Sequence, residues 1–378
     1  MSDRIYRVGI IGGGRKGTAH GRCYHLNPRT EVVAIADTDP ENRQIFARRF
    51  GVAAYEDYRE MIGAEDVEIA APILPVGPNP EVVVGCAAMP GVKGILCEKP
   101  LAASLEEADR TVGACASRGI AFGAGDLDRN LPGFQKVKAH IDSGALGALR
   151  SITFFGGSGT ELSGGGCQIL SLMRMFAGDV DAQFAVGWVD NPESDHDQGG
   201  AGYVRFVNGV EALIHREEDG RGRGFVAACE SGVVRYDNFV LSVWRVPDDA
   251  RDGDDLERVD GVVAPVHVYG GFDRGYDAED WKWPGDRNAA SVQAIVDAID
   301  DGRDPPGSGD NGCKVLELAI ALRESHRQGH GALSLPLADR TLRMIPHPSR
   351  MENKKPIFGT EKYMEQLGSH TRKGVGSG

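Results

Sequence analysis

The stretch that decides the fold is Val8-Gly9-Ile10-Ile11-Gly12-Gly13-Gly14-Arg15-Lys16-Gly17. It opens with a short apolar run, which is typical of a buried parallel strand. It ends in the pattern G-x-G-x-x-G, formed by Gly12, Gly14 and Gly17. In such a turn the first glycine allows the tight bend, the second lets the backbone approach a pyrophosphate, and the third packs the helix on the strand. We therefore predict a Rossmann unit that binds a dinucleotide through Gly12, Gly14, Arg15, Lys16 and Gly17.

A second predicted strand, residues 31–36, ends at Asp37, twenty residues past Gly17. A carboxylate at this distance holds the ribose hydroxyls of the cofactor. Because the same carboxylate repels a 2′-phosphate, Asp37 favours NAD over NADP. His20 follows the glycine turn on the predicted helix, where a place at the cofactor and a place on the helix surface are both open, and we expect the helix surface.

Strands and helices continue to alternate along the chain. We expect helices over residues 40–50 and 81–89, and strands over residues 67–71 and 94–97. Short connections between such elements favour a doubly wound parallel sheet, whose ligand lies beyond the carboxyl ends of the strands. The proline-rich loop 72–80 and the tripeptide Glu98-Lys99-Pro100 both fall at such ends. The tripeptide is therefore predicted to bring the Lys99 cation to the cofactor.

With these motifs the sequence resembles the Gfo/Idh/MocA oxidoreductases, the group of glucose–fructose oxidoreductase and inositol dehydrogenase. The resemblance covers roughly residues 5–345. It is carried by the glycine turn, Asp37, the proline loop, Cys97-Glu98-Lys99-Pro100-Leu101 and the run from Lys136 to Gly147.

The resemblance implies a fold and a set of site residues. It places Lys99 beside the nicotinamide and the reacting sugar carbon, and the bond to the following proline is commonly cis in the family. It implies a second domain with an open, mostly antiparallel sheet, with the substrate between this sheet and the nicotinamide. The residues that it places with the cofactor are Leu74, Pro75, Asn79, Glu98 and Lys99.

Two motifs depart from the family pattern. Asn79 stands where the family usually has a histidine. The family also usually carries Gly-x-His-x-x-Asp on a helix of the second domain, where the histidine is the general base. This chain reads Gly166-Cys167-Gln168-Ile169-Leu170-Ser171, so Gln168 replaces the base and Ser171 its orienting acid. An amide holds a hydroxyl or carbonyl by hydrogen bonds but does not take up a proton at neutral pH.

Either another residue is the base or the chemistry differs from the usual reaction of the family. Lys99 is one candidate, if its surroundings favour the neutral amine. Asp126, Asp128 and Arg129 follow a predicted strand at residues 120–122, in a stretch that matches the family's substrate-facing entry to the second domain. His196 lies in Ser194-Asp195-His196-Asp197, before another predicted strand. We predict that these side chains face the substrate.

The second half of the chain is predicted in less detail. We expect a helix over 168–176, strands near 183–189, 203–207, 210–216, 225–229 and 239–246, and two late helices near 292–299 and 315–327. The aromatic residues between 269 and 283 suit stacking on a sugar or a subunit interface. We expect a nucleotide-binding domain over 1–125, a substrate and oligomerisation domain of α+β type over 126–345, and an arm or partly disordered tail over 346–378.

Composition agrees with a cytoplasmic enzyme. Of the 378 residues 41% are hydrophobic, which is ample for two domain cores. A net charge of −13 argues against nucleic acid and anionic membranes as partners. The first strand begins too early for a signal peptide, and apolar runs are too short for a membrane span. The seven cysteines lack metal-ligand spacing, so we expect no metal and no disulfides.

Three functional classes are open at this point. The first is an NAD-dependent oxidoreductase acting on a sugar, polyol or sugar derivative, in a dimer or tetramer of identical subunits. The second is an NAD-dependent glycoside hydrolase, which oxidises a sugar C3 hydroxyl transiently, eliminates the aglycone, adds water and reduces the ketone again. The third is a non-catalytic NAD-sensing protein, which the retained Lys99 disfavours. Absorbance of NADH at 340 nm separates the first class from the second.

Overall fold

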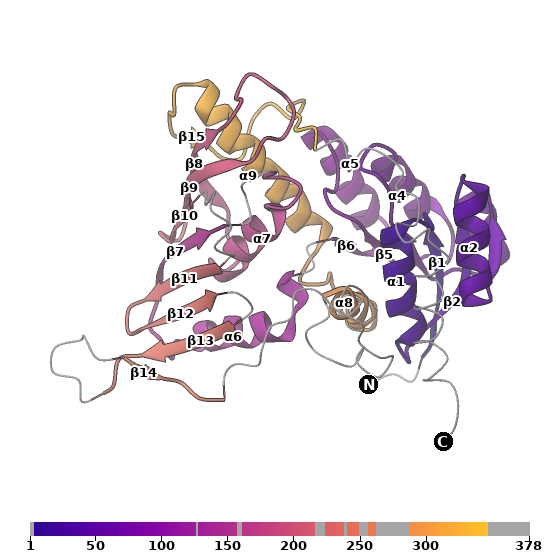
Figure 1. Ribbon diagram of the computed structural model, residues 1–378, viewed down its shortest axis with the longest axis horizontal. Coiled ribbons are helices and arrows are strands. Elements are labelled where there is room, and N and C mark those ends of the chain that lie inside the picture. Colours follow the sequence, from indigo (N-terminus) through magenta and orange to yellow (C-terminus); the bar gives the residue numbers. More distant parts are fainter. Residues whose placement is uncertain are drawn as a thin grey trace.

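The chain folds around two β-sheets, which lie side by side (Figure 1). A computed structural model describes residues 4–125, 128–156, 161–215, 224–237, 240–248, 256–261 and 287–346. Asp126, the aromatic segment 269–283 and nearly all of the expected C-terminal arm lie outside these residues.

The first sheet is a Rossmann sheet. Its six strands are parallel and follow the order β3-β2-β1-β4-β5-β6, which is the doubly wound order. This confirms the predicted fold of the N-terminal part. In chain order the strands are β1 (Tyr6–Ile11), β2 (Thr30–Ala36), β3 (Ala53–Tyr55), β4 (Ile69–Pro72), β5 (Gly94–Cys97) and β6 (Ala121–Ala124).

Helices connect these strands, and most of them begin at a capping side chain. Asp39 accepts a hydrogen bond from the Glu41 amide at 2.9 Å, and Ser104 accepts one from the Glu107 amide. The first helix differs, because Gly14 at its N-terminus offers no capping side chain. Its first amide groups are therefore available to an anion. The helices are α1 (Arg15–Leu26), α2 (Pro40–Phe50), α3 (Tyr58–Ala64), α4 (Asn79–Ala88) and α5 (Leu105–Ala116).

The second sheet has nine strands in the order β14-β13-β12-β11-β7-β10-β9-β8-β15. All neighbours pair antiparallel except β7 and β10, so the sheet is mostly antiparallel, as expected. The sequence did not indicate β12. The strands are β7 (Leu149–Phe155), β8 (Ala182–Val189), β9 (Gly200–Phe206), β10 (Glu211–His215), β11 (Gly224–Cys229), β12 (Gly232–Asp237), β13 (Val240–Arg245), β14 (Glu257–Arg258) and β15 (Leu333–Ser334).

Helices of the second half join the two sheets. The helices α7 (Cys167–Phe176) and α9 (Gly309–Arg327) lie between the nine-stranded sheet and the Rossmann sheet (Figure 1). The helix α8 (Arg287–Asp301) returns to the Rossmann sheet, where Val292, Ile295 and Val296 are fully buried in one cluster with Val8 and Ile10. The remaining helices are the 3-10 turn η1 (Asp128–Asn130) and α6 (Pro132–Asp142). Within the described residues no helix combines the length and apolar character needed to cross a membrane.

Candidate active site

A cavity of about 510 Å³ opens at the carboxyl ends of the Rossmann strands. Its size suits a small-molecule or cofactor site. The glycine turn, the ends of β2, β3 and β4 and the tripeptide after β5 all contribute to it. Its lining includes Gly12, Gly14, Arg15, Lys16, Gly17, Asp37, Leu74, Pro75, Glu98 and Lys99. The structure therefore brings together ten of the eleven residues that were predicted to bind the cofactor.

The glycine turn is closed so tightly that side chains do not fit. A Cβ on Gly17 would lie 1.8 Å from the carbonyl oxygen of Gly12. Gly12 has φ +94°, and a Cβ there would lie 2.6 Å from the carbonyl oxygen of Ile73. Both positions need glycine for a physical reason, and the turn leaves backbone and the uncapped start of α1 facing the cavity.

Asp37 lies at the end of β2 and closes one side of the turn. Its Oδ2 accepts a hydrogen bond from the Gly13 amide at 2.7 Å, and its Oδ1 accepts one from the Asp39 amide at 2.8 Å. These two bonds fix the carboxylate at the cavity wall, and each oxygen keeps a further lone pair for a hydroxyl group. The arrangement suits a ribose diol and opposes a phosphate at the same place.

Lys99 lies between the cofactor cavity and the loop that precedes α7. Its Nζ donates to the carbonyl oxygen of Gly164 at 2.8 Å, so a side chain at the cofactor cavity contacts a loop of the second half. The Lys99-Pro100 peptide bond is cis, as the family resemblance implied. Gly125 packs against the lysine backbone, since a Cβ on Gly125 would lie 2.5 Å from the Lys99 nitrogen. An ammonium group has three donors, and two remain for a ligand in the cavity.

A buried histidine supports the same segment. The sequence placed His20 on the surface of its helix, and this was wrong, because His20 is fully buried. Its Nε2 lies 3.0 Å from Glu98 Oε1 and donates to it, since a carboxylate only accepts. Burial by itself would raise the pKa of Glu98. The hydrogen bond from His20 and the charges of Lys16 and Lys99 outweigh burial and hold this pKa well below its usual range.

Gln168 begins α7 and is buried with both ends of its amide occupied. Its Nε2 donates to the Gly125 carbonyl at 3.0 Å, and its Oε1 accepts from the Asp128 amide at 2.9 Å. The side chain thus ties α7 to the segment that leaves β6. These two bonds hold α7 in place. A direct contact between Gln168 and the substrate remains a prediction.

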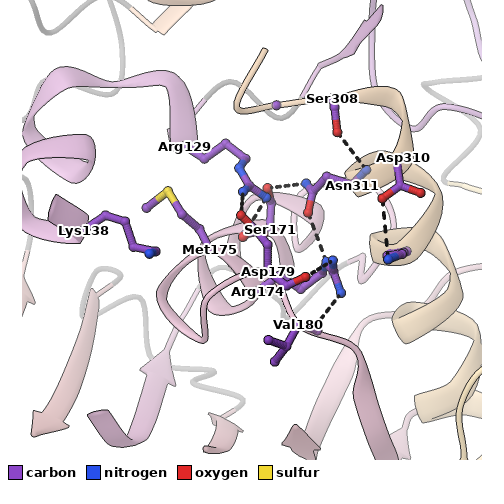
Figure 2. A network of polar contacts seen from close by, with 12 residues as sticks. Arg129, Lys138, Ser171, Arg174, Met175, Asp179, Val180, Ser308, Asp310 and Asn311 are labelled. Atoms are coloured by element: carbon purple, nitrogen blue, oxygen red, sulfur yellow. Dashed lines mark hydrogen bonds and ion pairs between the residues drawn. The ribbon is translucent and has the colours of Figure 1, made fainter. Parts of the chain in front are cut away.

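The Ser171 hydroxyl is also held by a neighbouring side chain, as Figure 2 shows. Its Oγ accepts from Asn311 Nδ2 at 2.9 Å, and Asn311 Oδ1 accepts in turn from Arg174 Nε at 3.1 Å. Arg129 pairs with Asp179 at 2.6 Å. Ser171 is therefore part of a network that joins α7 to α9. Arg129 faces this network, so its predicted role at the substrate gains no support from its position.

The other predicted substrate residues also lie away from the cofactor cavity. Asp128 is fully buried and pairs with Arg287 at 3.2 Å, which does not favour it as a general base. His196 is exposed, and the described residues that line the cavity do not include it. Asn79 is buried and donates to the Leu101 carbonyl at 2.9 Å, while its neighbours Pro78 and Val82 line the cavity.

Two parts of the site were not found from the sequence. Tyr58 and Arg59, at the start of α3, line the cavity directly beyond β3. The short strand before them was too weak a signal, although the rule of carboxyl strand ends would have pointed there. Asp197 was passed over in favour of His196, yet Asp197 is buried and its neighbour is exposed. Among the described residues no cluster of three or more His, Cys, Asp or Glu side chains could hold a metal.

The glycine cradle, the uncapped helix and the placed carboxylate fit a dinucleotide, and comparisons with known proteins agree. Residues 6–125 match the model of the Gfo/Idh/MocA oxidoreductase family, NAD-binding Rossmann fold. The chain is 36% identical over 149 residues to inositol 2-dehydrogenase of Acidothermus cellulolyticus, covering 39% of this chain and 43% of that protein. It is 32% identical over 153 residues to levoglucosan dehydrogenase of Pseudarthrobacter phenanthrenivorans, covering 38% of this chain and 39% of that protein.

A solved structure shares the fold of nearly the whole chain. Levoglucosan dehydrogenase in complex with NADH and levoglucosan matches with a TM-score of 0.71 and 22% identity, over 88% of this chain and 100% of that one. Fold and cleft thus define a nucleotide-binding Rossmann sheet joined to a mixed second sheet. Residues 6–125 match the NAD-binding Rossmann fold of the Gfo/Idh/MocA oxidoreductase family, and NAD is the cofactor of this fold. In sequence it matches less than half of the length of the curated relatives named above.

Proposed function

We propose that the protein is an NAD-dependent dehydrogenase that oxidises a hydroxyl group of a sugar, polyol or sugar derivative. The observation that carries this proposal is Lys99, whose amine lines the cofactor cavity and contacts Gly164 of the second half. The named relatives act on inositol and levoglucosan according to their names, which supports a hydroxyl-rich substrate.

The chemistry follows from the position of the amine. Oxidation of an alcohol removes a hydride and a proton, and bound NAD supplies the hydride acceptor. In the proposed reaction Lys99 enters as the neutral amine, accepts a hydrogen bond from the reacting hydroxyl and takes its proton, which leaves the charged ammonium beside Glu98. Gly164 holds the amine from the other side, so the lysine needs little reorganisation when the substrate arrives. In this account the reacting hydroxyl is not contacted by Gln168, Asp128, Arg129 or His196.

A panel of polyols, free sugars and aryl glycosides tests the proposal. Each compound is incubated with the protein and NAD while absorbance at 340 nm and aglycone release are recorded together. The proposal expects NADH to accumulate with at least one polyol or sugar. Aglycone release without NADH would overturn it in favour of the glycoside hydrolase, a class that the named relatives do not favour.

We also propose a homo-oligomer in the cytoplasm. The face of the nine-stranded sheet that turns away from the core carries Trp188, which is 47% exposed and stacks on His330, and Leu213, which is 37% exposed. Apolar side chains on an open sheet face favour a second copy as partner. All seven cysteines are free, which suits a reducing compartment. Light scattering on the wild type and on Trp188→Glu tests the interface, because a monomeric wild type would contradict it.

The limits of the domains remain predictions. We propose that the nucleotide-binding domain ends at residue 125, where the family match ends. The second domain is then residues 126–345, although α8 in this range packs on the Rossmann sheet.

A further inference from the structure

Asp197 is a buried carboxylate of the second half with four hydrogen bonds. It is 4% exposed and lies just before β9. Its Oδ1 accepts from the amides of Leu162 at 2.7 Å and Gly199 at 3.1 Å. Its Oδ2 accepts from the amide of Ser163 at 2.6 Å and from Ser163 Oγ at 2.7 Å. These bonds use the full accepting capacity of a carboxylate.

Three of the four bonds fix one short loop, residues 161–166, at the start of α7. The loop is closed on itself, because the Gly166 amide donates to the Glu161 carbonyl at 2.8 Å. The residue after Ser163 is Gly164, whose carbonyl oxygen accepts from Lys99 Nζ at 2.8 Å and from Cys167 Sγ at 3.0 Å. Asp197 therefore determines where the acceptor of the lysine amine lies.

We propose that Asp197 is the positioning residue of the reaction centre, acting on Lys99 through the loop 161–166. The inference rests on the proposed function of Lys99. Through this loop, Asp197 in the second half of the chain influences Lys99 at the cofactor cavity. Asp197 does not touch the cofactor cavity, so its effect passes through the carbonyl of Gly164.

A double-mutant cycle separates this role from general support of the fold. Asp197→Asn keeps the size of the side chain but turns one accepting oxygen into a donor that faces the Ser163 amide. We expect turnover to fall by about tenfold or more, since small misplacements of a reacting group have large effects. In a Lys99→Ala background the same substitution should change turnover by less than about twofold. A purely structural residue would lower turnover by the same factor in both backgrounds, and that result would overturn the proposal.

Two further variants keep the test sharp. Ser163→Ala removes one of the four bonds and leaves the backbone bonds, so we expect a smaller loss, about threefold. It replaces Asp197→Asn in the cycle if the latter does not fold. Asp195→Asn is the matched control on the same segment, because its half-exposed carboxylate pairs with Arg327 at 3.0 Å and not with the loop. It should leave turnover unchanged.

A second readout does not depend on a substrate. Acetic anhydride acetylates lysine side chains. Mass spectrometry then gives the rate of acetylation of Lys99 relative to that of Lys93, with and without NAD. Asp197→Asn should raise the relative rate at Lys99 at least about threefold, because the amine loses its fixed acceptor. An unchanged rate would overturn the positioning role even if no substrate is found. A normal turnover of Lys99→Ala would instead overturn the proposed function, so the two failures are distinct.

Discussion

The cofactor cleft and the start of α7 face each other across Lys99, yet they are built from different kinds of contact. The cleft is formed by backbone atoms and by residues close in sequence, such as Gly12, Gly17 and Asp37. The start of α7 is held by side chains that reach distant segments, as Gln168 reaches Gly125. Backbone-built sites tolerate little change, whereas side-chain networks can be exchanged as a set. Two of the three departures from the family pattern, Gln168 and Ser171, accordingly lie at α7, whereas the third, Asn79, begins α4 beside the cleft.

The largest expected effect is at the glycine turn. In Gly17→Ala the new methyl group would meet the Gly12 carbonyl at 1.8 Å, so the turn must open. We expect NAD affinity to fall at least about a hundredfold in calorimetry, because the cradle amides no longer converge. Gly63→Ala, in a helix where a Cβ meets nothing within 4 Å, is the control and should bind normally. Normal binding by Gly17→Ala would mean that the cofactor lies elsewhere.

A smaller effect is expected at Asp37. The carboxylate should make the protein bind NAD at least about tenfold more tightly than NADP, which corresponds to ~1.4 kcal/mol. In Asp37→Ser this preference should shrink, because the repulsion of the 2′-phosphate disappears. Titration of the wild type and of Asp37→Ser with NAD and with NADP gives the four dissociation constants. Equal affinities of the wild type for NAD and NADP would refute the assignment of Asp37.

Gln168→Ala tests the side-chain contacts at the start of α7. It leaves the Asp128 amide and the Gly125 carbonyl without their buried partners, which costs on the order of 1–3 kcal/mol of folding stability. Denaturant unfolding measures this loss. Because an amide does not titrate, the shape of the pH–rate profile should stay the same. A silent variant would show that α7 does not need this brace.

A pH-dependent effect is expected at His20. The low pKa of Glu98 means that the ionised carboxylate stabilises the fold above its ordinary value near pH 4.5 and that this contribution is lost as the pH falls. His20→Ala removes the donor and should reduce stability at neutral pH by ~1–3 kcal/mol. The difference from wild type should shrink below about pH 4. Unfolding curves measured across this range check it, with His196→Gln at an exposed histidine as control, and a constant difference would contradict the pairing.

The sequence indicated the fold far better than it indicated the side chains of the substrate half. Alternating strands and helices predicted the parallel sheet, and Gly12, Gly17 and Asp37 needed only local spacing to be placed. Gln168 bonds to Gly125, 43 residues away, and Asp197 bonds to Ser163, 34 residues away, and no local pattern marks these pairs. His20 was misjudged for the same reason, because Glu98 follows it by 78 residues. In strand β12 buried residues alternate with more exposed ones, but this alternation did not distinguish the strand from the sequence around it.

The central claim is that Lys99 acts in the chemical step and that NAD binding does not depend on it. The direct measurement is a single-turnover experiment at 340 nm with saturating NAD, run alongside calorimetry with NAD, on Lys99→Ala and on the control Lys93→Ala, whose amine pairs with Glu68. Lys99→Ala should form NADH at least about a hundredfold more slowly than the wild type while binding NAD within about twofold of it. The control should match the wild type in both. A Lys99→Ala variant that forms NADH at the wild-type rate would contradict the account.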